Sequence, residues 1–98
     1  MEFTKPHNGM ITVYSKSGCN YCVKVKQLLT ENERKFIVID CDEYILENKE
    51  EFLLFIKEMI GKEYRFFPMV FDNSIFIGGY NETVKYLEKV DLDFDTQF

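Results

Sequence analysis

The order in which strand-like and helix-like patterns follow each other constrains this fold most. Residues 10–14, MITVY, are β-branched and aromatic, which predicts a short strand, and the apolar run 35–39, KFIVI, predicts a second. Between them, over residues 20–32, apolar side chains recur on one helical face: Cys22, Val25, Leu28 and Leu29. A strand, a helix and a strand in this order pair the strands in parallel through a right-handed crossover. The nearly continuous apolar run of 35–39 further predicts a strand buried on both faces.

The next part of the chain predicts a helix followed by a hairpin. Five apolar side chains recur at helical spacing just before Gly61, where we expect the helix to end: Phe52, Phe55, Ile56, Met59 and Ile60. A third strand begins in FPMVF, residues 67–71, and a fourth spans residues 74–77. The turn at Asp72 and Asn73 between them is tight, which predicts an antiparallel hairpin.

A last helix over residues 81–89, with Val84 and Leu87 facing inward, completes the predicted order β-α-β-α-β-β-α. This order belongs to the α/β class and gives a four-stranded mixed sheet with helices on both faces. We expect a loose N-terminal leader over residues 1–9, one domain over 10–90 and a frayed acidic tail over 91–98.

Charge and composition exclude several classes of function. The net charge is -5 and the isoelectric point about 4.8, which argues against a nucleic-acid partner. No apolar run approaches the roughly 20 residues that cross a bilayer, so we expect no membrane partner. The first ten residues lack the pattern of a secretory signal, which leads us to expect a cytoplasmic protein.

The three cysteines divide into a pair, Cys19 and Cys22, and a single Cys41. Three readings of the pair stay open: a zinc half-site, a structural disulfide and a redox couple. A structural zinc ion needs four ligands, and the chain offers only Cys41 and His7 besides the pair. A permanent disulfide is rare in reducing compartments. The redox couple is therefore favoured.

The position of the pair suits redox chemistry, because the thiolate is the reactive form of cysteine. Cys19 lies where the first strand gives way to the first helix, so the helix dipole favours its thiolate, and Lys16 and Lys24 add positive charge. Cys22, one turn further on, is within reach to close a disulfide. Cys41 has acidic neighbours that should raise its pKa, and we expect it to be inert.

Three segments resemble the glutaredoxin family. YSKSGCNYC (14–22) is similar to the glutaredoxin active-site segment, FFPMVF (66–71) to the segment with a cis-proline, and IFIGGYNE (75–82) to the Gly-Gly segment before the last helix. The resemblance implies a thioredoxin-like fold and glutathione-dependent reduction of protein disulfides and glutathione mixed disulfides. It implies that Cys19 attacks as the nucleophile. Either Cys22 then resolves the intermediate as an internal disulfide, or a second glutathione releases it.

The resemblance also implies a glutathione site. Lys16 would pair with a glutathione carboxylate, Tyr21 would wall the groove, and the backbone of Phe67 before a cis-Pro68 would bind the cysteinyl part. Gly78 and Gly79 would allow close approach. The N–H groups of Tyr80 and Asn81, at the start of the last helix, would hold the γ-glutamyl carboxylate.

Three residues depart from the family pattern. Asn20 stands where proline is frequent after the first cysteine, and some glutaredoxins without that proline bind an iron–sulfur cluster across a dimer. Asn81 stands where Asp is common, which replaces an ion pair by a hydrogen bond. Leu53 stands where Gln or Arg often meets the glycyl carboxylate, and Lys49 or Lys57 would have to substitute.

We therefore expect a monomeric enzyme with no tightly bound cofactor, glutathione as cosubstrate, and disulfide-containing or glutathionylated proteins as partners. One alternative is a thioredoxin-like hydrogen donor, for example to ribonucleotide reductase, recharged by thioredoxin reductase. The other is a non-catalytic iron–sulfur carrier.

Overall fold

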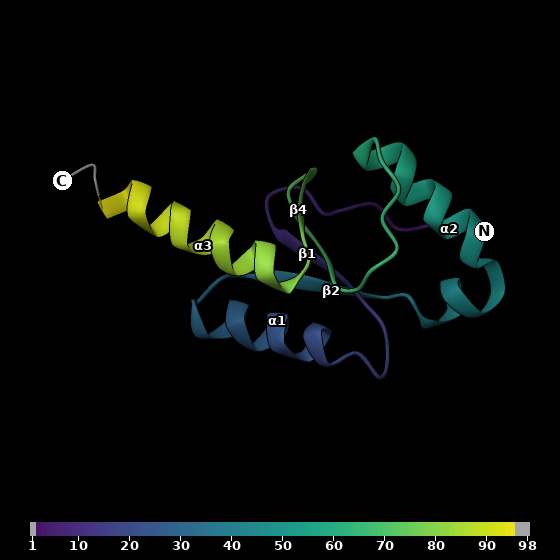
Figure 1. The fold of residues 1–98 in the computed structure, drawn as a ribbon, viewed down its shortest axis with the longest axis horizontal. Helices are drawn as coiled ribbons and strands as arrows, with labels where there is room; N and C mark the ends of the chain where they lie inside the picture. The colour runs from purple at the N-terminus through teal and green to yellow at the C-terminus, as the bar shows by residue number, and fades with distance from the viewer. Residues whose placement is uncertain (1, 96–98) are drawn as a thin grey trace.

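The computed structural model describes the backbone of residues 2–95 and the side chains of residues 2–90. Its elements run in the predicted order, which is confirmed (Figure 1): β1 (Ile11–Ser15), α1 (Asn20–Glu31), β2 (Phe36–Asp40), α2 (Asp42–Ile60), β3 (Met69–Asp72), β4 (Ile75–Gly78) and α3 (Tyr80–Asp95). No helix in this described part is long and apolar enough to span a membrane.

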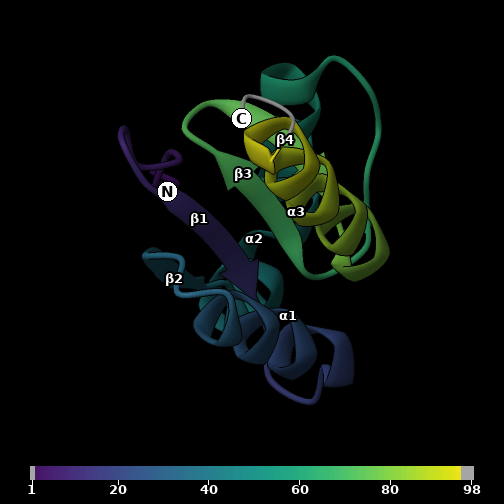
Figure 2. The same ribbon diagram turned by 90° about the vertical axis from the view of Figure 1, so that its left-hand side faces the viewer.

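The four strands form one mixed sheet in the order β2-β1-β3-β4. β1 pairs in parallel with β2, with Val13 opposite Val38, and antiparallel with β3, and β3 forms the predicted hairpin with β4. Figure 2 shows β1 and β3 side by side. The expectation that residues 35–39 are buried on both faces is wrong. β2 is an edge strand in which Val38 is 45% exposed, whereas all five residues of β1 are buried.

Helices cover both faces of the sheet, as predicted. α1 and α3 lie on one side and α2 on the other (Figures 1 and 2). The core on the α2 side is built from Tyr14, Ile39, Cys41, Phe52, Ile56, Met69 and Phe71. The core under α1 and α3 is built from Ile11, Val13, Val25, Leu29, Val70 and Leu87. Adjacent residues of β1 thus serve opposite cores, because successive strand side chains alternate between faces.

Two helices are longer than their apolar spacing indicated. α2 begins at Asp42, well before Phe52, and Asn48 inside it has non-helical angles of φ -144° and ψ 49°. This kink interrupts the apolar period, so only the second half of α2 has a clear helical pattern. α2 ends at Gly61 as predicted, with a left-handed φ of 81°. α3 continues to Asp95, through part of the segment expected to fray, and residues 96–98 lie outside the described residues.

The segment before β1 forms neither helix nor strand, but it contacts the domain. The ring of Phe3 packs 4.9 Å from that of Tyr44 and 5.5 Å from that of Phe52. The hydroxyl of buried Tyr14 donates a hydrogen bond of 2.6 Å to the backbone oxygen of Thr4. These contacts anchor the start of the described chain to the core on the α2 side.

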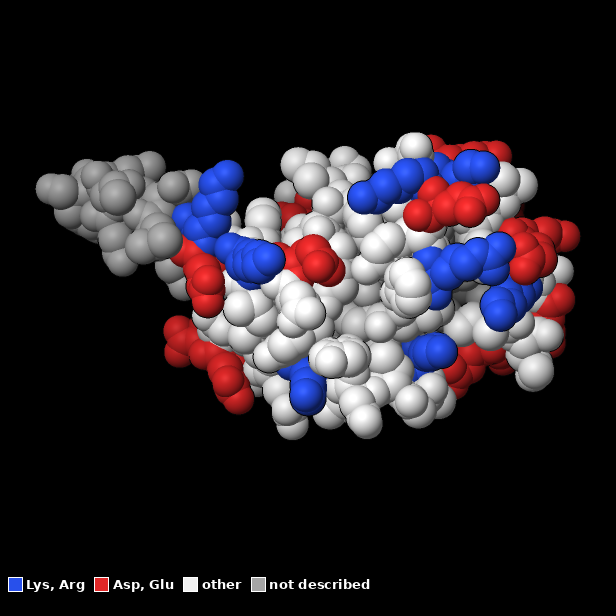
Figure 3. All heavy atoms as spheres, viewed as in Figure 1, with Lys and Arg blue, Asp and Glu red and all other residues white. Residues whose placement is uncertain are grey.

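Charged side chains of both signs are interspersed on the surface. In the view of Figure 3, basic and acidic groups lie next to each other over the α2 end of the molecule, with a largely uncharged area beside them. The visible face thus has no continuous basic stripe of the kind that follows a nucleic-acid backbone.

Candidate active site

Cys19 is the residue that caps the N-terminus of α1, as its place in the sequence predicted. Its φ of -113° and ψ of 106° are extended, and its sulfur accepts a hydrogen bond of 3.1 Å from the backbone N–H of Cys22. The side chain is half-buried. A sulfur at this position faces the positive end of the helix dipole and a backbone N–H donor.

Cys22 differs from Cys19 in its surroundings. It is 1% exposed, and both residues are free cysteines. Burial raises the pKa of the Cys22 thiol, and its hydrogen bond with the Cys19 side chain raises it further. The structure therefore pairs a half-exposed sulfur at a helix N-terminus with a buried thiol one turn further along the helix.

The loop that presents Cys19 is held by the first residue of α2. The backbone N–H and the hydroxyl of Ser17 donate hydrogen bonds of 2.8 and 2.5 Å to the Asp42 carboxylate. These two bonds, and then the nearby charge of Lys16, hold the pKa of Asp42 below its usual value. The sequence analysis considers Asp42 only as an acidic neighbour of Cys41. An acidic residue at a helix start was the signal that could have identified it.

The segment before β3 faces this loop. The Phe67–Pro68 peptide is cis, which confirms the prediction. The Cys19 sulfur lies 3.7 Å from the backbone oxygen of Phe67, and the Lys16 ammonium lies 5.6 Å from the centre of the Phe67 ring. Cys19, Lys16 and Phe67, which the sequence assigned to one site, are therefore neighbours in space.

The start of α3 approaches the same place. The centres of the Tyr21 and Tyr80 rings are 5.8 Å apart. The Tyr21 ring also contacts Lys24, whose ammonium lies 5.2 Å from the ring centre. The N–H of Gly79 donates a 2.8 Å hydrogen bond to the carboxylate of Glu82 in the first turn of α3. The Glu82 side chain thus caps the N-terminus of the helix to which it belongs. The sequence analysis did not predict this cap. Asn81 is exposed beside it.

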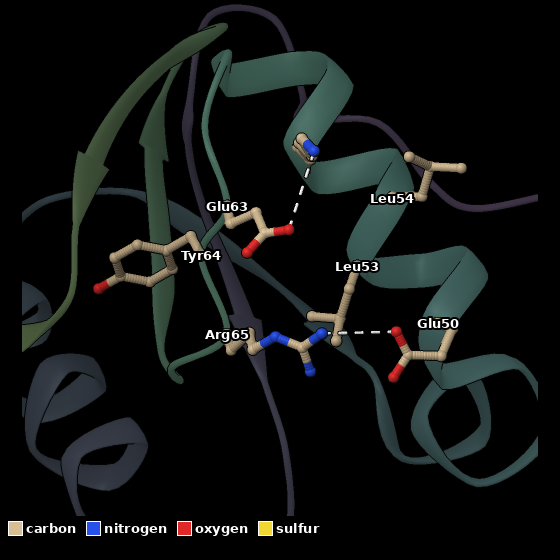
Figure 4. A pocket seen from close by; sticks show the side chains of 7 residues that line it. Glu50, Leu53, Leu54, Glu63, Tyr64 and Arg65 are labelled. Carbon is tan, nitrogen blue, oxygen red and sulfur yellow. Dashed lines mark hydrogen bonds and ion pairs between the residues drawn. The ribbon is translucent and has the colours of Figure 1, made fainter.

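A separate groove contains Leu53, the residue that departs from the family pattern (Figure 4). The Lys57 ammonium lies 3.8 Å from the Glu63 carboxylate, and the Arg65 guanidinium 3.5 Å from the Glu50 carboxylate. The side chain of Arg65 lies next to that of Leu53 (Figure 4), so the groove contains a cationic group although residue 53 itself is apolar. Of the two lysines that the sequence analysis named here, Lys57 lines the groove and Lys49 does not, and Arg65 was not predicted.

Cys41 lies in the core and not at the surface of the site. Burial, followed by its acidic neighbour Asp40, raises its pKa to about 12, which agrees with the expected direction. Among residues 2–90, no three His, Cys, Asp or Glu side chains are grouped so that they could hold a metal ion. Cys19 is the one cysteine of the described chain that is not buried.

Comparison with known proteins identifies the family. The glutaredoxin family model matches residues 11–77. Over 76 residues the chain is 32% identical to mitochondrial glutaredoxin-2 of Bos taurus, which is 78% of this chain and 46% of that protein. Over 69 residues it is 35% identical to glutaredoxin 1 of Rickettsia felis, which is 70% of this chain and 63% of that protein. The chain thus matches about half of the length of these curated relatives.

A solved structure matches the fold more completely. Glutaredoxin 1 from Francisella tularensis, complexed with cacodylate, superposes with a TM-score of 0.71 at 26% identity, over 82% of this chain and 93% of that one. The four-stranded sheet with helices on both faces is therefore the thioredoxin-like fold. The chain belongs to the glutaredoxin family, within the thioredoxin superfamily.

Proposed function

We propose that this protein is a glutathione-dependent oxidoreductase that reduces protein disulfides and glutathione mixed disulfides, with Cys19 as nucleophile and Cys22 as resolving thiol. The observation that carries the proposal is the asymmetry of the pair. The half-exposed Cys19 sulfur accepts the N–H of Cys22 at the start of α1, whereas the Cys22 thiol is buried one turn further on. The Cys19 sulfur can therefore meet an incoming disulfide, and the Cys22 thiol is placed to attack the Cys19 sulfur afterwards.

The reaction follows from thiol–disulfide exchange. The Cys19 thiolate attacks one sulfur of the substrate disulfide, forming a Cys19 mixed disulfide and releasing the other sulfur as a thiolate. If that mixed disulfide holds glutathione, a second glutathione thiolate attacks the glutathione sulfur, glutathione disulfide leaves, and Cys19 returns as a thiolate. Alternatively, Cys22 attacks the Cys19 sulfur and expels the bound thiol, which oxidises the pair to an internal disulfide.

The surroundings of Cys19 suit a peptide thiol with two carboxylates. Lys16, whose ammonium lies beside the Phe67 ring, offers charge for one carboxylate, and the N-terminus of α3 offers N–H groups for the other. The backbone of Phe67, next to the Cys19 sulfur, can hydrogen-bond an extended peptide. The Tyr21–Tyr80 pair supplies an aromatic wall for the same ligand.

Turnover of a small glutathione mixed disulfide, coupled to glutathione reductase and NADPH, tests this function. We expect turnover by the wild type, none by Cys19→Ser, and retained turnover by Cys22→Ser through the second glutathione. A wild type that is inert in this assay but is reduced by thioredoxin reductase would contradict glutathione dependence and favour the hydrogen-donor alternative.

The iron–sulfur alternative has a separate readout. Cluster iron is held by cysteine thiolates, and among the described residues only Cys19 is accessible for this. A cluster would therefore need a second chain or glutathione as further ligands. Anaerobic purification with glutathione should give a colourless protein if the redox proposal holds. A coloured protein that is inactive in the coupled assay would contradict it.

A further inference from the structure

A second hollow lies next to the cysteine pair, at the carboxyl end of β1. Both cysteines line it together with polar side chains from three elements: Ser15, Lys16, Ser17, Lys26 and Asp40. This hollow is distinct from the Leu53 groove, since the two share no lining residue. The buried Cys22 is therefore in contact with a polar surface hollow on this side.

A hydrogen bond joins Lys26 to Ser15 within this hollow, which Cys22 also lines. The half-buried Lys26 ammonium donates a 3.3 Å hydrogen bond to the hydroxyl of Ser15. Ser15 is 5% exposed and lines the hollow together with Cys22, and its hydroxyl lowers the pKa of the Cys22 thiol. Ser15 ends β1 and Lys26 is one turn beyond Cys22 on α1, so both groups are fixed by regular structure.

Cys22 needs such assistance, because it must lose its proton before it can attack. Burial and the Cys19 side chain raise its pKa, whereas the Ser15 hydroxyl and the backbone N–H of Lys16 act in the opposite direction. The titratable and charged groups that face this region come from every neighbouring element: Cys19 and Lys26 of α1, Lys16 after β1, Asp40 of β2, and Cys41 before α2. Among these groups, Lys26 is the one that hydrogen-bonds Ser15, whose hydroxyl lowers the pKa of the Cys22 thiol.

We propose that Lys26, acting through Ser15, stabilises the Cys22 thiolate in the resolving step and thereby opens the dithiol route. The proposal rests on the proposed function and deepens it. In this step Lys26, which donates a hydrogen bond to the Ser15 oxygen, polarises the Ser15 hydroxyl, and that hydroxyl donates to the Cys22 sulfur as its negative charge forms. Lys26 and Ser15 are positioning residues, and Cys22 is the catalytic one.

In the resolving step, Cys22 closes an internal disulfide with Cys19 and the bound thiol is expelled. The Cys22 thiol releases its proton to solvent in the hollow, and the resulting thiolate attacks the Cys19 sulfur. The Cys19–Cys22 bond forms while the bond between Cys19 and the bound thiol breaks. That thiol leaves with the electron pair and takes up a proton, so the substrate disulfide is reduced and the two cysteines are oxidised.

A glutathione-free reagent separates this step from the proposed function. Dithiobis-nitrobenzoate releases one coloured thiolate when Cys19 attacks it and a second when Cys22 resolves the adduct. Stopped-flow mixing should show two phases, of which the second is independent of reagent concentration and absent from Cys22→Ser. We expect Lys26→Met and Ser15→Ala each to slow the second phase relative to the first about tenfold at neutral pH. The pH profile of the second phase should move up by about one pH unit.

Three variants keep the test specific. Lys26→Arg, which retains the charge, should keep the second phase, and the Ser15→Ala/Lys26→Met double variant should be no slower than either single variant. Lys35→Met removes an exposed charge just before β2, away from the hollow, and should leave the second phase unchanged. A folded Lys26→Met variant with an unchanged second phase or pH profile would overturn the proposed role of Lys26 and Ser15, and it would leave the proposed function standing. Loss of the first phase in the wild type would contradict the proposed function.

Discussion

Replacing Gly78 by alanine should destabilise the protein more than replacing any other glycine with an unusual backbone angle. Gly78 ends β4 with a φ of 132°, which side chains rarely adopt. A Cβ atom at this position would lie 2.7 Å from the Cβ and 2.8 Å from the Cγ of Glu82. The backbone angle and the collision with α3 therefore act together.

The expected loss follows from these two contributions. The backbone conformation costs a non-glycine residue about 1–3 kcal/mol. Overpacking against the Glu82 side chain costs about 1–3 kcal/mol more. The sum, roughly 2–6 kcal/mol, is a large share of the roughly 5–15 kcal/mol by which a domain of this size is stable. The melting temperature should fall by at least about 8 °C, since each kcal/mol shifts it by about 4–8 °C.

Gly61 offers a matched control. It has a φ of 81°, but a Cβ atom there would meet no other atom within 4 Å. Gly61→Ala should therefore cost only the backbone contribution, about 1–2 kcal/mol. Urea unfolding followed by far-ultraviolet circular dichroism measures both variants. Equal losses, or a smaller loss for Gly78→Ala, would refute the argument that the approach of α3 requires glycine.

Three further predictions concern other parts of the molecule. Asp42→Asn should lower the stability at neutral pH, because the pKa of Asp42 is lowered in the folded protein. The carboxylate then contributes to stability above its unfolded pKa of about 3.9, and this contribution is lost as the pH falls through the folded pKa. The difference in urea midpoint from wild type should therefore close in strong acid, and a constant difference would contradict this. Phe3→Ala should cost about 2 kcal/mol in thermal unfolding, since its half-buried ring packs against the core, and an unchanged melting temperature would show that the segment is not anchored. Iodoacetamide at mildly alkaline pH should modify Cys19 well before Cys41, which is buried and has a pKa of about 12; peptide mapping showing equal rates would contradict the burial of Cys41.

The fold was predictable from sequence where the signals are local. A turn at Asp72 and Asn73 and a strand–helix–strand order fix the hairpin and the parallel pair. The position of β2 at the sheet edge was not predictable from its apolar run. It depends on β3 taking the other side of β1, which is a contact between distant parts of the chain. The first half of α2 was missed because the kink at Asn48 breaks the helical period.

The site divides in the same way. Cys19 at the start of α1 could be placed from the change of pattern at residues 14–20, and the family resemblance supplied the cis-Pro68. The hydrogen bonds of Ser17 to Asp42, of Lys26 to Ser15 and of Arg65 to Glu50 join residues from different elements. Side-chain contacts of this kind require the folded geometry. The same contacts hold the Cys19 loop through Ser17, join Lys26 to Ser15 in the proposed relay, and fix Arg65 in the Leu53 groove.

In the proposed reaction, Cys19 forms the mixed disulfide and Cys22 resolves it. The most direct measurement is to incubate Cys22→Ser with glutathione disulfide and to map the attached glutathione by peptide mass spectrometry. Without the resolving thiol, we predict that the adduct persists with one glutathione per chain, attached to Cys19. An adduct on Cys41, or no adduct in a folded and reduced protein, would contradict the account.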